Sequence, residues 1–143
     1  MSTTLLLGMA WTIGAPALKP LPNPEVIVGE WRLIDSYHAG KSDFELQRTA
    51  IDTVRITQDD WSAISQGRVC VKSAIRVDTK NRPAQIDIGV PAPNQPGSLL
   101  GIFKIEGDTL TVAYDDAPNA RPTKFESPRT SSIQVLIFQR IKP

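Results

Sequence analysis

The segment LLGIFKIEGDTLTVAYD, residues 99–115, contains two runs in which apolar residues recur at nearly every second position. Side chains two residues apart lie on the same face of a β-strand, so each run has the pattern of a strand with one buried face. Gly107 and Asp108 separate the two runs. Glycine readily adopts the positive φ that a two-residue hairpin turn requires, so the segment predicts an antiparallel hairpin.

The same period of two recurs along the chain from Gly29 onward, and turn-forming residues interrupt it at short intervals. In residues 68–78, the odd-numbered positions form a mainly apolar row that we expect to face inward: Val69, Val71, Ser73, Ile75 and Val77. The expected strands are Gly29–Tyr37, Thr53–Gln58, Trp61–Gln66, Arg68–Asp78, Ala84–Val90, Leu99–Glu106, Thr109–Asp115 and Ser132–Ile141. The chain beyond its first 24 residues is therefore predicted to be all-β.

Sequential antiparallel strands leave two edges unpaired unless the sheet closes on itself. A closed barrel pairs both edges, and the short connections favour it over a two-layer sandwich, which is the alternative. We therefore expect a single eight-stranded antiparallel up-and-down barrel. We also expect a short helical turn within Ser42–Ala50 and a proline-punctuated loop at Pro91–Gly97.

The composition is that of one ordinary globular domain, with 143 residues, of which 41% are hydrophobic and 22% charged. The formal net charge is +1 and like charges form no block, which argues against nucleic-acid binding. A single cysteine excludes an internal disulfide framework and, with a single histidine, leaves too few ligands for a zinc site. We expect no metal and no cofactor.

The first 24 residues form a proline-rich leader, and residues 25–143 form the barrel domain. Leu5–Ala17 is an apolar stretch with Ala15 and Ala17 at the spacing that signal peptidase recognises, although no Lys or Arg precedes it. At about thirteen residues it is too short for a transmembrane span, which takes roughly twenty. Either the leader is a signal peptide and the protein is exported to the periplasm or the medium, or it is retained as an arm of a cytoplasmic protein.

Gly29-Glu30-Trp31 in the first expected strand and Arg140 in the last resemble the Gly-x-Trp and terminal Arg of lipocalin-like barrels. In such a barrel, Trp31 would fill the closed end and the Arg140 guanidinium would stack on the indole, tying the first strand to the last. Gly29 would allow the chain to turn closely under the floor.

A wider resemblance covers residues 29–35, 100–112, 121–125 and 133–140, which are similar to a family of small lipocalin-like domains of planctomycete bacteria. The resemblance implies the barrel fold and a bacterial source. The family has no assigned activity, so the resemblance implies no catalytic residue.

Few side chains are candidates for chemistry. His38 is expected at the rim of the barrel, and Cys70 has no partner histidine at a recognisable spacing, so both have structural interpretations. The pairs Asp59-Asp60 and Asp115-Asp116 could hold a hard cation, but they fall where turns are expected and aspartate is itself a turn residue. We expect no enzymatic activity.

An eight-stranded barrel is either filled by side chains or just wide enough for one small ligand, and the sequence leaves both outcomes open. Small residues at Ala63, Ser73 and Gly101 would leave room near the open end. For a small apolar or amphipathic ligand, Pro91–Gly97 would be the lid and Tyr114 would orient the ligand through its hydroxyl. The expected ligand-binding residues are Leu33, Trp61, Val71, Ile75, Ile88, Phe103, Tyr114 and Phe138.

The alternative is a barrel with a solid core that contacts a protein partner through its outer face and loops. Ile133, Val135 and Ile137 favour it, because they lie on the face opposite Leu136 and Phe138. They would then either lie under the N-terminal arm or form an exposed apolar patch.

The mass of the mature protein distinguishes the two interpretations of the leader. We expect mass spectrometry to show a chain that begins shortly after Ala17, as cleavage at the Ala15–Ala17 site would produce. An intact Met1 or Ser2 at the N-terminus would contradict export by this signal.

Overall fold

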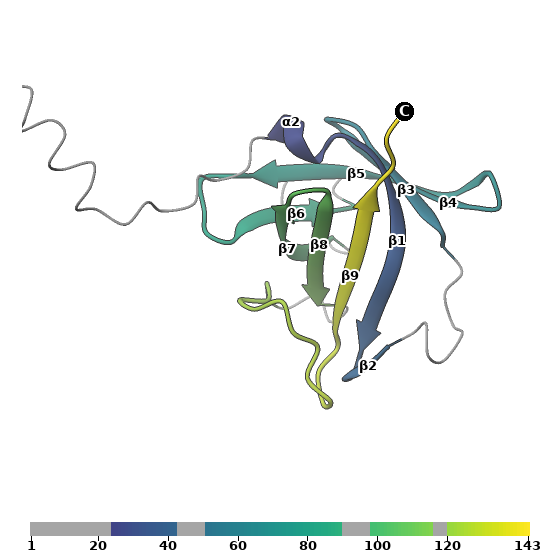
Figure 1. The fold of residues 1–143 in the computed structure, drawn as a ribbon. Helices are drawn as coiled ribbons and strands as arrows, with labels where there is room; N and C mark the ends of the chain where they lie inside the picture. Colours follow the sequence, from purple (N-terminus) through teal and green to yellow (C-terminus); the bar gives the residue numbers. More distant parts are fainter. Residues whose placement is uncertain (1–23, 43–50, 90–97, 116–119) are drawn as a thin grey trace, which may run out of the picture.

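The computed structural model describes residues 24–42, 51–89, 98–115 and 120–143, which form one antiparallel sheet rolled into a barrel (Figure 1). A single helical turn, α2 (Pro24–Ile27), precedes the sheet. The strands are β1 (Gly29–His38), β2 (Lys41–Ser42), β3 (Thr53–Ile56), β4 (Asp60–Ser65), β5 (Arg68–Asp78), β6 (Ala84–Ile88), β7 (Leu99–Glu106), β8 (Thr109–Asp115) and β9 (Ile133–Arg140).

The barrel closes through the first and last strands. The strands pair in the order β1-β3-β4-β5-β6-β7-β8-β9, and β9 returns to pair with β1 from Trp31↔Arg140 to His38↔Gln134. The two-residue strand β2 only extends the end of β1. The predicted eight-stranded up-and-down barrel is therefore confirmed, and the sandwich is excluded because one continuous ring of pairings replaces two separate layers.

The period-two pattern predicted β5, β7 and β8 with their observed bounds, and the Gly107 turn between β7 and β8 has the expected positive φ of 60°. The other strands differ from the expected bounds by one or two residues. The helical turn expected within Ser42–Ala50 lies outside the described residues except for Ser42, which belongs to β2. The leader up to residue 23 and the loop Pro91–Gly97 also lie outside them.

The closed end of the barrel is sealed by Trp31 and Arg140, as predicted. The Arg140 guanidinium carbon lies 4.1 Å from the centre of the Trp31 ring, which is fully buried. Trp31 Nε1 donates to the carbonyl of Ile27 at 2.9 Å, and Arg140 donates to the carbonyls of Val26 at 2.6 Å and Val28 at 3.3 Å. These bonds hold α2 across the end of the barrel, where Figure 1 shows it beside the C-terminus.

Gly29 is required by this arrangement. Its φ is +145°, and a β-carbon at this position would lie 3.0 Å from Arg140 Nη1. A side chain would therefore be both strained and in contact with the guanidinium that closes the barrel.

The half of the barrel next to this end is filled by side chains. Its largest fully buried residues include Trp31, Phe103, Phe138, Ile56, Ile86 and Leu110. They form one cluster with Ile27 of α2, so the apolar inner row of each strand packs into a common core.

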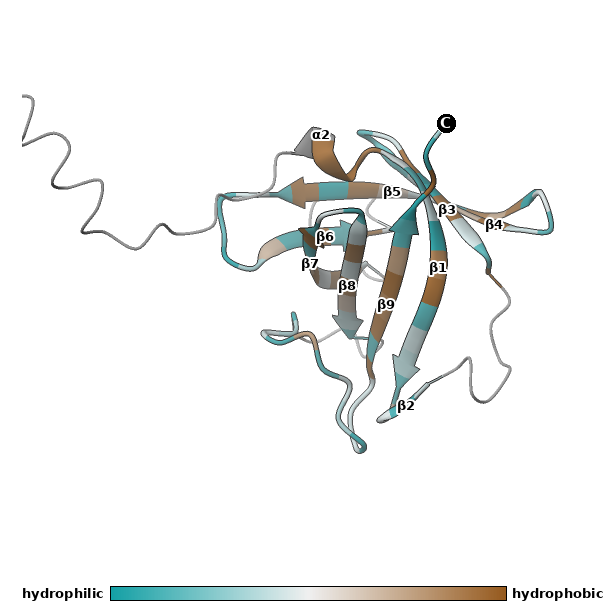
Figure 2. Ribbon diagram, in the orientation of Figure 1, coloured by the Kyte–Doolittle hydropathy of each residue, from teal (hydrophilic) through white to brown (hydrophobic). Residues whose placement is uncertain are grey.

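A second, smaller cluster lies on the outer face of the sheet, where Ile102, Ala113 and Val135 are buried. Partly buried residues packed against it are Tyr37, Phe125, Ile133 and Ile137. The outer row of β9 is therefore not an exposed patch, and Phe125 is part of its cover; the N-terminal arm, the other cover expected, lies outside the described residues. Figure 2 shows the result as a brown middle section of β9, because both faces of this strand meet apolar residues.

The segment that carries Phe125 is attached to the sheet by polar contacts. Arg121 Nη1 donates to the carbonyl of Gly101 at 2.7 Å and lies 2.7 Å from Asp87 Oδ1. Ser127 Oγ donates to the carbonyl of Ile133 at 2.6 Å. The described part of the connection between β8 and β9 therefore runs over the outer face of the barrel, which explains why the outer row of β9 is covered.

The apolar row expected to face inward along β5 is not buried along its whole length, because Val69 and Val71 are each 53% exposed. β5 pairs with β6 only from Ile75 to Asp78, so the first part of β5 has β4 as its paired neighbour. The β4–β5 hairpin consequently extends beyond the barrel wall, at the right of Figure 1.

Truncation at the closed end should destabilise the protein strongly. We expect Trp31→Ala to lower the free energy of unfolding by about 3–5 kcal/mol, because it removes a fully buried indole. Arg140→Ala should cost about 1–3 kcal/mol through two lost charged hydrogen bonds and the ring contact. Urea unfolding measures both. Arg55→Ala is the control, since its exposed pair with Glu30 should contribute less than about 1 kcal/mol. Equal losses of unfolding free energy for the Arg55 and Arg140 variants would contradict the role of Arg140 in closing the barrel.

The cover over the outer cluster can be tested with Phe125→Ala. We expect it to lower the free energy of unfolding by about 1–3 kcal/mol, less than for a fully buried phenylalanine, because the ring is only half-buried. Thr123→Ala changes an exposed residue of the same segment and should leave the stability unchanged. Equal urea midpoints for the Phe125 variant and the unmodified protein would show that the ring does not stabilise the cluster.

Candidate ligand-binding pocket

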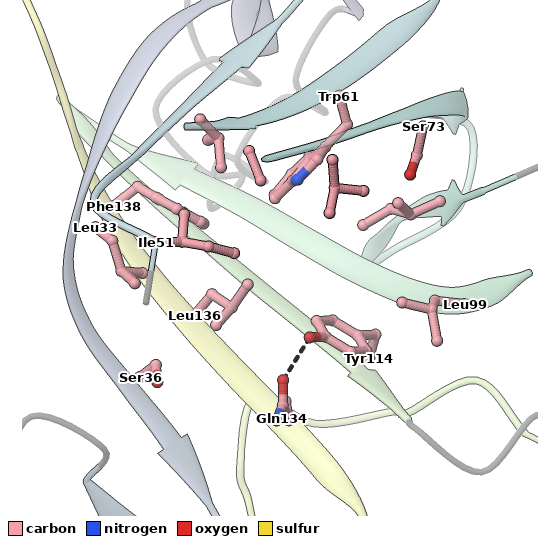
Figure 3. Close-up of a pocket in the computed structure, with 14 residues that line it drawn as sticks. Leu33, Ser36, Ile51, Trp61, Ser73, Leu99, Tyr114, Gln134, Leu136 and Phe138 are labelled. Carbon is pink, nitrogen blue, oxygen red and sulfur yellow. Dashed lines mark hydrogen bonds between the residues drawn. The ribbon is translucent and has the colours of Figure 1, made fainter. Parts of the chain in front are cut away.

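The half of the barrel away from Trp31 contains a cavity of about 380 Å³ that is partly open to solvent (Figure 3). The described interior of the barrel therefore contains an open cavity beside a filled core, which combines features of the two outcomes that the sequence left open. The residues that line the cavity are Leu33, Ser36, Ile51, Val54, Trp61, Ala63, Val71, Ser73, Ile88, Leu99, Tyr114, Gln134, Leu136 and Phe138.

The deep wall of the cavity is aromatic. The rings of Trp61 and Phe138 meet edge to face, with centroids 5.7 Å apart, and both belong to the main core cluster. Along β9 the lining then continues away from the closed end through Leu136 to Gln134. The cavity thus runs from an aromatic base toward a more polar rim.

The polar groups near the rim include one side-chain hydrogen bond. Tyr114 at the end of β8 donates its hydroxyl proton to Oε1 of Gln134 at the start of β9, the bond dashed in Figure 3. Adjacent strands position the pair, because Tyr114 and Gln134 are direct partners in the β8–β9 register. Both side chains are half-buried, so the pair remains accessible from the cavity.

Six of the eight expected ligand-binding residues line the cavity: Leu33, Trp61, Val71, Ile88, Tyr114 and Phe138. Phe103 does not, because it lies in the filled core and is only 1% exposed. Leu99 lines the cavity four residues earlier on the same strand, and at about 3.4 Å per residue Phe103 lies roughly 13 Å further along the strand. Ile75 is half-buried against the core cluster and also lies outside the lining.

The sequence analysis did not assign six of the lining residues to the cavity: Ser36, Ile51, Val54, Leu99, Gln134 and Leu136. Gln134 could have been found from the sequence, because it continues the inward row of Phe138 and Leu136. A search for apolar lining residues does not select it, because its side chain is polar. Ser36 was not detectable from a strict period of two, because the β1–β9 register shifts between Leu33 and Asp35. Such a bulge moves the next inward position by one residue. Of the small residues expected to leave room, Ala63 and Ser73 line the cavity and Gly101 does not.

The residues considered for chemistry lie apart from the cavity lining. His38 is exposed at the end of β1, and Cys70 is exposed with its Sγ 3.7 Å from the carbonyl oxygen of Arg68. Asp60 lies 3.9 Å from Lys72 Nζ, and the Asp59 carbonyl accepts the amide of Ile75.

The second aspartate pair, Asp115-Asp116, is described only at its first residue, which is engaged in a hydrogen bond. Asp115 accepts a hydrogen bond from Ser132 Oγ, while Asp116 lies outside the described residues. Within the described ranges, no three His, Cys, Asp or Glu side chains are grouped so that they could hold a metal ion.

A second hollow, of about 360 Å³, lies at the closed end beside Arg140 and is lined mainly by polar residues. Three of its charged residues are engaged with one another: Asp108 lies 3.0 Å from Lys142 Nζ and 4.0 Å from Arg140 Nε. These contacts belong to the closure of the barrel, so the apolar cavity is the better candidate site.

The chain matches no protein-family model, no curated protein and no solved structure among those with which it was compared. None of the helical structure in the described residues has the length and apolar character needed to cross a bilayer.

Proposed function

We propose that this protein binds a small apolar or amphipathic molecule inside a lipocalin-like barrel, without catalysing a reaction on it. The supporting observation is the cavity of about 380 Å³ with a mostly apolar lining. Ligand sites in proteins typically have volumes of about 300–1,000 Å³, apolar walls and a few placed polar groups. The volume lies near the lower end of that range, which favours a ligand with few heavy atoms.

The energetics favour an apolar ligand. Removing apolar surface from water contributes about 25 cal/mol per Å², and the aromatic base of Trp61 and Phe138 provides a large apolar contact. The access route avoids the closed end, where Trp31 and Arg140 block the barrel. The ligand therefore enters at the opposite end, past Val71 and the Tyr114–Gln134 pair.

The alternative of an interaction module with a solid core has less support. It rested on a filled interior and on an uncovered outer row, whereas the barrel contains a cavity and Phe125 packs against the outer cluster. We propose export of the protein on the basis of the leader sequence alone.

Binding can be detected with two small neutral probes, butylbenzene and octan-1-ol. We expect each to raise the melting temperature and to quench part of the tryptophan emission, because Trp61 lines the cavity and is 6% exposed. Trp61→Phe should remove the quenching and keep the thermal shift.

A matched pair of variants tests whether the cavity is the site. Val71 and Val69 lie on the same strand and are each 53% exposed, but only Val71 lines the cavity. We expect Val71→Phe to narrow the access route and weaken butylbenzene binding at least about fivefold, which is roughly 1 kcal/mol, while Val69→Phe leaves it unchanged. No thermal shift with either probe, or equal effects of the two variants, would refute binding in this cavity.

A further inference from the structure

The part of the cavity wall that the described residues form contains no fixed charge. The fourteen described lining residues include no Asp, Glu, Lys, Arg or His. Arg121, which is not part of this lining, is engaged with Asp87 and with the carbonyl of Gly101. A charged ligand group would therefore lose its hydration without gaining an opposite charge from the described wall, which is costly in an apolar site.

The polar groups of the wall are neutral, and their hydrogen bond determines what they offer a ligand. Because Gln134 Oε1 accepts the Tyr114 proton, the amide presents its N–H donors, and the phenol oxygen presents lone pairs. A group that both accepts and donates one hydrogen bond complements this pair. Aliphatic alcohols and primary amides have such groups, whereas carboxylates only accept and ammonium groups only donate.

The position of the pair sets the orientation of the ligand. Tyr114 and Gln134 lie toward the rim, and the aromatic base of Trp61 and Phe138 lies deeper (Figure 3). An alkyl chain directed at the base leaves its head group between the phenol and the amide, where it can hydrogen-bond without entering the apolar part of the cavity.

We infer that the cavity selects neutral amphipathic molecules with an alcohol or primary amide head group, and discriminates against carboxylates and ammonium ions of the same chain length. The head group binds between Tyr114 and Gln134, and the chain extends toward Trp61. This inference rests on the proposed function, since it names the class of ligand for the same cavity.

A series with one chain length tests the selectivity at pH 7: octan-1-ol, octanamide, octanoate and octylammonium, with butylbenzene as the apolar reference. Dissociation constants come from calorimetry and from quenching of Trp61. We expect octan-1-ol and octanamide to bind at least about tenfold more tightly than the two ions, because only the ions lose charge solvation.

A second arm tests the hydrogen-bonding pair. Gln134→Leu should weaken octanamide relative to butylbenzene about three- to tenfold, the usual range for one lost hydrogen bond. Gln139→Leu is the matched control, because Gln139 lies on the same strand, is exposed and does not line this cavity.

The outcomes separate the two proposals. If butylbenzene and all four octyl compounds fail to bind, the proposed function is wrong. If butylbenzene binds but octanoate or octylammonium binds as tightly as octanamide, selection for neutral ligands is refuted while the binding cavity stands. An octanamide affinity that Gln134→Leu leaves unchanged, or that falls in parallel with that of butylbenzene, would refute the role of the pair.

Discussion

The contact between the Arg140 guanidinium and the Trp31 indole is the constraint on which the rest of the barrel depends. It lies where the first and last strands meet, and it links both to the carbonyls of Val26 and Val28. Since strand order follows chain order around the ring, joining these two strands removes both free edges of the sheet. The same contact closes one end of the cylinder, so the proposed ligand would enter from the other.

Closure at one end divides the interior into two parts with different chemistry. Next to Trp31, large side chains such as Phe103 and Leu110 fill the barrel completely. Beyond the Trp61–Phe138 contact, smaller residues and partial strand pairing leave a cavity. The filled half and the outer cluster under Phe125 supply stability, so the cavity does not have to be filled for the protein to fold.

The proposed selectivity for uncharged ligands follows from where the described charged residues lie. Charged side chains pair on the outer surface or at the closed end, as in Arg121 with Asp87 and Lys142 with Asp108. The described cavity lining has only neutral polar groups, among which Tyr114 and Gln134 form a hydrogen-bonded pair. Binding by such a surface would come from apolar contact, with orientation supplied by a single neutral head group.

Alternation of apolar and polar residues was sufficient to predict the strands, their order around the barrel and most of the inner face, because each depends on local periodicity. The Trp31–Arg140 closure was also predictable, from the resemblance of Gly29-Glu30-Trp31 and Arg140 to the Gly-x-Trp and terminal Arg of lipocalin-like barrels. Three features required the tertiary structure. The register shift after Leu33 brings Ser36 inward, the short pairing of β5 with β6 exposes Val69 and Val71, and the β8–β9 connection places Phe125 on the outer face. Each depends on contacts between segments distant in sequence, and a period of two carries no information about how far a strand is paired or what packs on its outer side.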